Sequence, residues 1–315
     1  MTTVDDMLYH LGGVPVLAGI PFSGNSRAFF VDPANGNDTF AGTTPDQAKA
    51  TVLAAYNLTT TARNDVVFFI PGGTADDPEA VLTWSKSYTH FVGLGPYLRG
   101  MGNRCRIEGA ADQDLTSLIT VSGSGCVFRG IKWINLADAN VDSGCMTVSG
   151  GRNSFYDCQI SGMGHATPGA RAGSYSLTVS GGENYWGDCT IGLDTIVRAA
   201  ANAELVLATG AVRNTFQRCS FDSASETAGK FAVKVQATDR WAKFIDCDFY
   251  NFSDNHANTL TNVFNTTGSS GTYHMRMLGQ NSMIGYTGWA DTVTYIQSAM
   301  PAPNAGWGIA AAPTT

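Results

Sequence analysis

A chain of 315 residues with a formal charge of −7, of which only 14% are charged, offers no basic surface for nucleic acid. No apolar run reaches the 18 residues of a membrane-spanning helix, and the first ten residues carry Asp5 and Asp6 where a secretory signal would carry lysine or arginine. We therefore expect a protein that binds neither nucleic acid nor membranes, and that is made in a cytoplasm. The 36 glycines favour an all-β architecture with many tight turns.

The segment 1–27 is rich in apolar residues that proline and glycine interrupt. Its best helical stretch, from Val4 to Leu11, predicts one or two helical turns. A segment this short and apolar cannot bury itself, so we expect an arm that docks on the rest of the chain or on another protein. An ordinary frayed end is the alternative, although frayed ends are usually more polar. The docking contacts are assigned to Tyr9, Leu11, Val16 and Phe22.

The next stretch predicts one helix followed by strands. Thr44 is the expected helix cap, Pro45 lies in the first turn, and the alanine and leucine spacing predicts a helix over 45–58. Runs of β-branched and aromatic residues, bounded by glycine and proline, then indicate strands at 65–70, 80–84 and 90–94.

A repeat dominates the rest of the chain. Each unit has a short alternating strand, a corner rich in glycine or serine, a second strand led by an aromatic residue, and a third short apolar strand. This pattern is typical of one coil of a parallel β-helix, so we predict such a solenoid over 28–285, with the helix near 45–58 covering its open end. The units span 119–133, 146–160, 177–191, 205–221 and 233–249, with a weaker sixth at 273–285.

Equivalent positions of stacked coils lie directly above one another, about 4.8 Å apart. The repeat therefore predicts two columns of inward side chains with a ladder of cysteines between them. One column holds Phe155, Trp186, Phe216 and Phe244, the other Ile160, Ile191, Phe221 and Phe249, and the ladder Cys158, Cys189, Cys219 and Cys247.

The ladder cysteines could instead bind a metal or form redox pairs. No histidine occurs at matching offsets, none of the seven cysteines forms a CxxC pair, and Ile131 takes the cysteine position in the first unit. Because free cysteine is among the most buried residue types, we interpret these residues as part of the core.

The stretch "FFVDPANGNDTFAGTTPDQAKATVLAAY", followed by "FFIPGG" and "HFVGLGP", resembles the first coils of pectate-lyase-like right-handed parallel β-helix proteins. This resemblance covers roughly residues 29–285 and implies an all-β, single-stranded, right-handed parallel β-helix with an N-terminal capping helix. The family includes polysaccharide lyases, hydrolases and epimerases as well as phage tailspike and virion proteins, so the resemblance specifies fold more than function.

Glycan cleavage on this fold would need paired carboxylates, or an acidic Ca²⁺ cluster beside an arginine or lysine base. The NTD, DD and GHG motifs of the polygalacturonase-like members are absent. The remaining acidic residues fall at unequal offsets and are interpreted as solvated loop charges, so no catalytic residue, metal or cofactor is assigned. They are Asp138, Asp142, Asp194, Glu204, Asp222, Glu226 and Asp254, the last with His256.

Three further features have two interpretations each. Asp157, Asp188 and Asp246 precede the ladder cysteines and are interpreted as bend residues bonded to local backbone amides, with a Ca²⁺ site as the alternative. The insertion 161–175, with His165 and Arg171, is expected on the binding face. The connection 250–273, with Phe252 and Phe264, could meet a sugar or a neighbouring subunit.

These features together predict a phage virion structural protein, in particular a decoration or cement protein on the capsid surface, synthesised in the host cytoplasm. Its expected partner is the major capsid protein or another virion protein, and analogy with other phage β-helix proteins predicts a homotrimer. The Ala/Pro-rich tail 286–315 is a second apolar end. The alternative is a tailspike-like protein that binds or cleaves host surface polysaccharide, so a glycan partner stays open.

Overall fold

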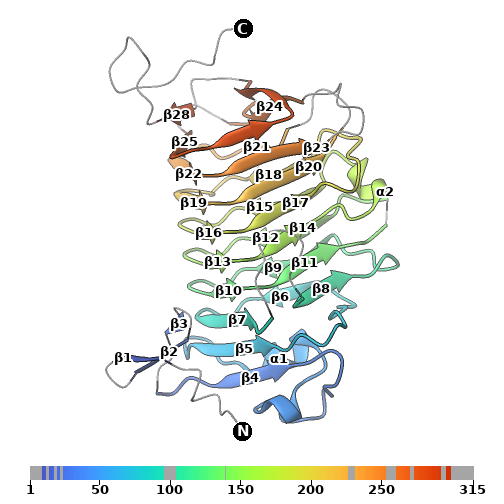
Figure 1. Cartoon of the computed structure of the whole chain (residues 1–315), viewed down its shortest axis with the longest axis vertical. Helices are drawn as coiled ribbons and strands as arrows, with labels where there is room; N and C mark the ends of the chain where they lie inside the picture. Colours follow the sequence, from blue (N-terminus) through green and yellow to red (C-terminus); the bar gives the residue numbers. More distant parts are fainter. Residues whose placement is uncertain are drawn as a thin grey trace.

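The chain folds as a right-handed parallel β-helix in this computed structural model (Figure 1). The coils are stacked along the long axis of the molecule, from β4 near the N-terminal end to β28 near the C-terminal end. The structure describes residues 9–11, 14–17, 20–21, 24–95, 104–138, 140–225, 231–252, 260–269, 273–291 and 296–298.

Three parallel sheets run the length of the solenoid, and each repeat unit contributes one strand to each of them. The ten-stranded sheet contains β4 (Ala28–Val31), β5 (Asp65–Phe69), β7 (Thr89–Gly93), β10 (Val127–Arg129), β13 (Ser154–Tyr156), β16 (Tyr185–Gly187), β19 (Asn214–Gln217), β22 (Trp241–Ile245), β25 (His274–Leu278) and β28 (Ile296–Ser298). The seven-stranded sheet contains β8 (Arg106–Gly109), β11 (Lys132–Asn135), β14 (Gln159–Ser161), β17 (Thr190–Leu193), β20 (Ser220–Ala224), β23 (Asp248–Phe252) and β26 (Ser282–Ile284). The eight-stranded sheet contains β6 (Leu82–Trp84), β9 (Ser117–Val121), β12 (Gly144–Val148), β15 (Tyr175–Val179), β18 (Ala203–Leu207), β21 (Val233–Val235), β24 (Leu260–Asn265) and β27 (Tyr286–Ala290).

The aromatic column lies inside the ten-stranded sheet. Phe155 is in register with Trp186, Trp186 with Phe216, and Phe216 with Phe244. The ring centroids of these pairs lie 5.3, 4.6 and 5.2 Å apart with nearly parallel planes, and all four side chains are fully buried. The second column is in register in the seven-stranded sheet, through Ile160, Ile191, Phe221 and Phe249.

The cysteine ladder follows the turn between these two sheets. Cys158, Cys189, Cys219 and Cys247 are buried free thiols. Cys105 belongs to the same column: Lys132 pairs with Arg106, which places Ile131 above Cys105 and below Cys158. The ladder thus begins two coils before the first predicted cysteine.

The predicted helix over 45–58 is two shorter elements. A 3-10 helix, η2, spans Pro45–Gln47, and α1 spans Val52–Leu58. Between them Lys49 exchanges backbone hydrogen bonds with Phe30 and Asp32, which continues the sheet edge and interrupts the helix. The cap of α1 is consequently Thr51, whose hydroxyl accepts the N–H of Ala54, and not Thr44, whose side chain makes no capping bond.

α1 covers the N-terminal end of the core. Its Val52, Ala55 and Tyr56 are buried, and the ring of Tyr56 lies 4.3 Å from that of Trp84 in the first coils. Figure 1 places α1 beside β4 and β5 at this end of the solenoid. No helix among the described residues is long and apolar enough to cross a membrane.

The two ends differ in detail from the sequence-based expectation. β1 (Tyr9–Leu11), β2 (Val14–Leu17) and β3 (Ile20–Pro21) form an antiparallel sheet, so residues 9–11 are a strand and not the helical turn expected there. At the other end β27 and β28 pair with β24 and β25, so the coils continue beyond residue 285, where the tail was expected to begin. Residues 299–315 lie outside the described residues.

Candidate functional site

The acidic residues nominated by the sequence have different surroundings. Asp138 and Asp142 are exposed, and Asp142 lies 3.4 Å from the Arg171 guanidinium. Glu226, Asp254 and His256 lie outside the described residues. Asp194 is half-buried at the end of β17. The exposure of Asp138 and Asp142 agrees with their interpretation as solvated loop charges.

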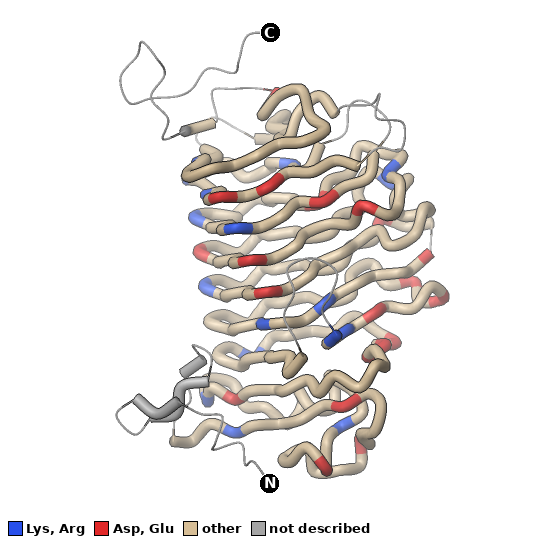
Figure 2. The backbone as a smooth tube through the Cα atoms, in the orientation of Figure 1, with Lys and Arg blue, Asp and Glu red and all other residues tan. Residues whose placement is uncertain are grey.

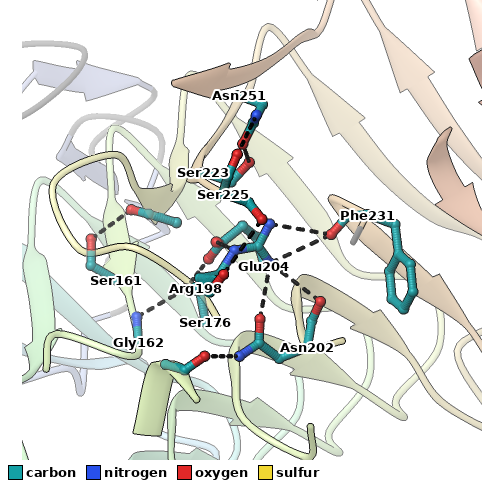
Figure 3. Close-up of polar contacts among 12 residues, drawn as sticks. Ser161, Gly162, Ser176, Arg198, Asn202, Glu204, Ser223, Ser225, Phe231 and Asn251 are labelled. Atoms are coloured by element: carbon teal, nitrogen blue, oxygen red, sulfur yellow. Dashed lines mark hydrogen bonds and ion pairs between the residues drawn. The ribbon is translucent and has the colours of Figure 1, made fainter. Parts of the chain in front are cut away.

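Glu204 is the exception, and its interpretation as a solvated loop charge is wrong. It lies in β18 with only 1% of its surface exposed, and its Oε1 is 3.1 Å from Nε of Arg198 (Figure 3). The hydroxyl of Ser176, one coil earlier, donates to Oε2 of Glu204 across 2.5 Å. The carboxylate is therefore enclosed at the corner between the seven- and eight-stranded sheets.

The Arg198 guanidinium is held by groups from several coils. Its Nη1 donates to the side-chain and backbone oxygens of Asn202 across 3.3 Å, and both terminal nitrogens reach the carbonyl oxygen of Phe231 across 3.4 Å. Asn202 in turn donates to the carbonyl oxygen of Gly169. These contacts tie the connection after β17 to the neighbouring coils.

Burial raises the pKa of Glu204 to about 7, while Arg198 and the hydroxyl of Ser176 oppose the shift. The backbone of Gly192 makes room for the carboxylate: a Cβ there would lie 2.8 Å from Cδ of Glu204 and 2.0 Å from the carbonyl oxygen of Asp222. Gly192 also has a φ of +108°, which disfavours any other residue.

Asp222 in β20 pairs with Gly192 in β17, beside the Glu204 carboxylate, so two nominated carboxylates do come near each other. Its carboxylate accepts from the hydroxyl of Ser220, and its charge contributes to the raised pKa of Glu204. However, Glu204 is sealed from solvent and paired with an equally buried arginine. This arrangement lies inside a corner of the solenoid and gives Glu204 no access to a polysaccharide.

The three aspartates before the ladder cysteines do occupy bends, because each has a positive φ, between 52° and 55°. Their partners differ from the expected local amides. Asp157 pairs with Arg129 at 3.3 Å and Asp188 with Arg218 at 2.6 Å, whereas Asp246 accepts the backbone N–H of Gln280. Within the described part of the chain, no group of three or more His, Cys, Asp or Glu side chains could hold a metal ion.

The segments 161–175 and 250–273, each given two interpretations from the sequence, place their named side chains differently. His165 caps the short helix α2 (Ala166–Gly169) by accepting the N–H of Thr167. Phe264 is fully buried in β24 and belongs to the core, so it cannot anchor an external ligand. Phe252, at the end of β23, stays exposed.

Sequence reasoning missed an asparagine ladder at the corner that precedes the ten-stranded sheet. The side-chain oxygens of Asn153, Asn184 and Asn214 accept the backbone N–H of the residue below, and their amides donate to glycine carbonyls. The signal was present, because an asparagine opens "NSFYDCQI", "NYWGDCTI" and "NTFQRCSF".

An open groove lies along this same corner, with a volume of about 520 Å³. Figure 2 shows acidic and basic residues following one another along the left edge of the stacked coils. In the described residues, Glu183 accepts from Arg152 below it and Arg213 above it, across 2.8 and 3.0 Å. The groove is lined by Tyr88, Ser124, Gly125, Gly151, Arg152, Gly182, Glu183 and Val212.

Comparisons with known proteins support the architecture. No protein-family model matches the sequence, and no curated protein matches it. Among solved structures, a pectin methylesterase in complex with a hexasaccharide aligns with a TM-score of 0.53 at 17% identity, covering 77% of each chain. The pectin methylesterase of Aspergillus niger aligns with a TM-score of 0.52 at 14% identity, over 90% of this chain and 92% of that one. These similarities define the class of the molecule, a right-handed parallel β-helix.

Proposed function

We propose that this chain is a structural protein of a phage virion, a decoration protein attached to the capsid surface through its N-terminal arm. The partner in this proposal is the major capsid protein or another virion protein, and the chain acts as a homotrimer. The solenoid serves as a rigid body, and residues 1–27 as the attachment.

The observation that carries the proposal is the enclosure of Glu204 in a buried ion pair with Arg198. Among the described residues, Glu204 and Asp222 are nominated carboxylates that lie near each other, but Asp222 is half-buried whereas Glu204 is enclosed. An enclosed Glu204 cannot reach a glycan, so this supports a structural role over glycan cleavage by the two carboxylates. The buried free thiols also suit a protein that is assembled in a reducing host cytoplasm.

The first test is immunogold labelling of intact phage particles with an antibody against this chain, viewed by negative-stain microscopy. Gold over the head is the expected result. Gold confined to the tail tip would reject capsid decoration.

A second test removes residues 1–26, which precede the first strand of the solenoid core. The truncated protein is expected to lose attachment to particles while its melting temperature stays close to that of the full chain. Attachment of the truncated protein would reject the docking role of Tyr9, Leu11, Val16 and Phe22. Tyr9 pairs with Val16 between β1 and β2, and Phe22 lies outside the described residues.

A tailspike-like protein that binds or cleaves host polysaccharide is the second candidate, and the open groove favours it. The structural neighbours include pectin methylesterases, one of them in complex with a hexasaccharide, so proteins of this fold class do bind saccharides. Incubation with host polysaccharide should then release reducing ends, and Asp194→Asn or Asp222→Asn should abolish the release. No release, together with gold over the head, would reject enzymatic cleavage.

A further inference from the structure

We propose that the groove beside Tyr88 binds a linear saccharide carrying an anionic group, either a carboxylate or a phosphate. This site goes beyond capsid attachment and rests on the second candidate function, glycan binding, for which it names the site and the class of ligand. Four observations carry the proposal: the path of the groove, its aromatic wall, its bare floor and its charge.

The groove runs along the solenoid axis, because its lining comes from the same corner of successive coils. Backbone N–H groups at this corner donate upward from coil to coil: Tyr88 to Ser124, Gly125 to Gly151, Arg152 to Gly182, and Glu183 to Val212. Five coils contribute, so the groove extends over roughly four spacings of about 4.8 Å, or about 19 Å. That shape suits an extended chain ligand.

Tyr88 supplies a ring face at one end of the groove. Its side chain is 51% exposed, the highest exposure among the described tyrosines, phenylalanines and tryptophans, and it has a φ of +52°, which is unfavourable for a bulky residue. A Cβ on Gly125 would lie only 2.7 Å from the Tyr88 ring, so the glycine allows the ring to lie against the backbone. An aromatic ring with a hydroxyl provides an apolar face and a polar edge, as a sugar ring requires.

The floor of the groove is peptide backbone. Gly151 and Gly182 lie there without side chains, and a Cβ on Gly151 would come within 2.9 Å of the Gly182 carbonyl oxygen. The carbonyl oxygens of both glycines already accept one backbone N–H each. A carbonyl oxygen has two lone pairs, so each can accept a second bond from a ligand hydroxyl.

Arg152 supplies the positive charge. Its side chain is 79% exposed, and only its Nε is used in the bond to Glu183. A guanidinium has further N–H donors, which match a carboxylate or phosphate group. Glu183 also accepts from Arg213, so two cations meet one anion at this corner of a chain whose net charge is −7. The local excess of positive charge favours an anionic ligand.

A peptide ligand fits this corner less well than a saccharide. An added β-strand needs unpaired backbone N–H and C=O groups along a sheet edge. Here the N–H groups of Gly125, Arg152 and Glu183 are all donated to the next coil. The groove thus offers a ring face, carbonyl acceptors and one guanidinium, which together match hydroxyls and an anionic group.

The full-length protein should be tested on a glycan microarray that carries carboxylated, phosphorylated and neutral linear saccharides. The variants Tyr88→Asn and Arg152→Asn remove the ring and the cation, and asparagine tolerates the positive φ at both positions. Arg240→Asn is the matched control, because Arg240 also has a positive φ and an exposed charge but lies outside the groove. Melting temperatures of all variants establish that they fold.

We expect binding to carboxylated or phosphorylated saccharides, and the two arms of the array distinguish between these anions. Tyr88→Asn and Arg152→Asn should each weaken binding about tenfold or more, which corresponds to about 1.4 kcal/mol. Arg240→Asn should bind like the wild type. Absence of binding to every anionic saccharide, preference for neutral ones, or equal binding by folded Tyr88→Asn would overturn the proposal.

Discussion

The thiol of Cys189 donates a hydrogen bond to the carbonyl oxygen of Phe155, one coil below, across 3.5 Å. The same relationship joins Cys219 to Trp186 and Cys247 to Phe216. Each coil therefore places an aromatic ring in one column and, three residues later, a thiol that reaches the backbone of the preceding coil. The fixed offset of three residues keeps the aromatic column and the thiol column in register along the solenoid.

Replacement of Cys189 by aspartate should lower the free energy of unfolding by several kcal/mol, because it buries an unpaired charge in the core. Cys189→Ala is the matched control and should cost only about 1 kcal/mol, since it removes a small side chain and one weak hydrogen bond. Denaturant-induced unfolding measures both variants. Equal unfolding midpoints for Cys189→Asp and the wild type would contradict the interior position of the ladder.

Replacement of a residue of the asparagine ladder should also lower the free energy of unfolding. Asn184 accepts the N–H of Asn153 across 2.9 Å and donates to the carbonyl oxygen of Gly150 across 3.1 Å. Asn184→Ala would leave two buried backbone groups unpaired, at about 1–3 kcal/mol each. The exposed Asn140→Ala should change stability by less than about 0.5 kcal/mol. If chemical denaturation gives similar values for both variants, the ladder bonds contribute little.

The repeat allowed the core to be predicted because stacking makes equivalent positions adjacent. Cys105 was missed for a related reason: the first coils depart from the repeat, so no alignment links residue 105 to the ladder. The asparagines were visible at equal offsets, but their role depends on corner geometry, in which each side chain reaches one N–H and one C=O of neighbouring coils.

The burial of Glu204 follows from the strand register, because it occupies the position of Ser176 in the preceding coil, one residue before the start of the unit 205–221. Its partner Arg198 could not be predicted, because it lies in the connection between β17 and β18, whose path is determined by contacts of Arg198 and Asn202 with other coils. Likewise, the helix predicted over 45–58 is interrupted because Lys49 pairs with the backbone of β4. In both cases tertiary hydrogen bonds override local sequence preference.

His90 should make the fold sensitive to acid. Its Nδ1 accepts the N–H of Val127 across 3.1 Å, and burial lowers its pKa to about 4. The unfolded chain therefore binds more protons between pH 6.5 and 4, so this group's contribution to stability is lost as the pH falls through that window. Between pH 6.5 and 4 the wild type should lose up to about 3 kcal/mol of unfolding free energy that His90→Gln does not lose. Urea unfolding at several pH values measures this difference. Parallel curves for the two proteins would contradict a buried neutral imidazole.

Glu204 should have the opposite effect on the pH dependence of stability. Because its pKa in the folded protein is raised from 4.5 to about 7, the folded state binds more protons in that window, and stability falls as the pH rises through it. The wild type should therefore lose up to about 3 kcal/mol relative to Glu204→Gln between pH 4 and pH 8, and glutamine can still accept from Ser176.

Arg198→Met provides the control for the Glu204 experiment. Arg198 lowers the pKa of Glu204, so its removal should raise that pKa further and move the window of falling stability to higher pH. Urea unfolding from pH 4 to pH 9 measures the three proteins under the same conditions. If stability falls over the same pH range without Arg198, the ion pair does not control the ionisation of Glu204. If the stability of the wild type depends on pH in the same way as that of Glu204→Gln, the carboxylate does not titrate in this range.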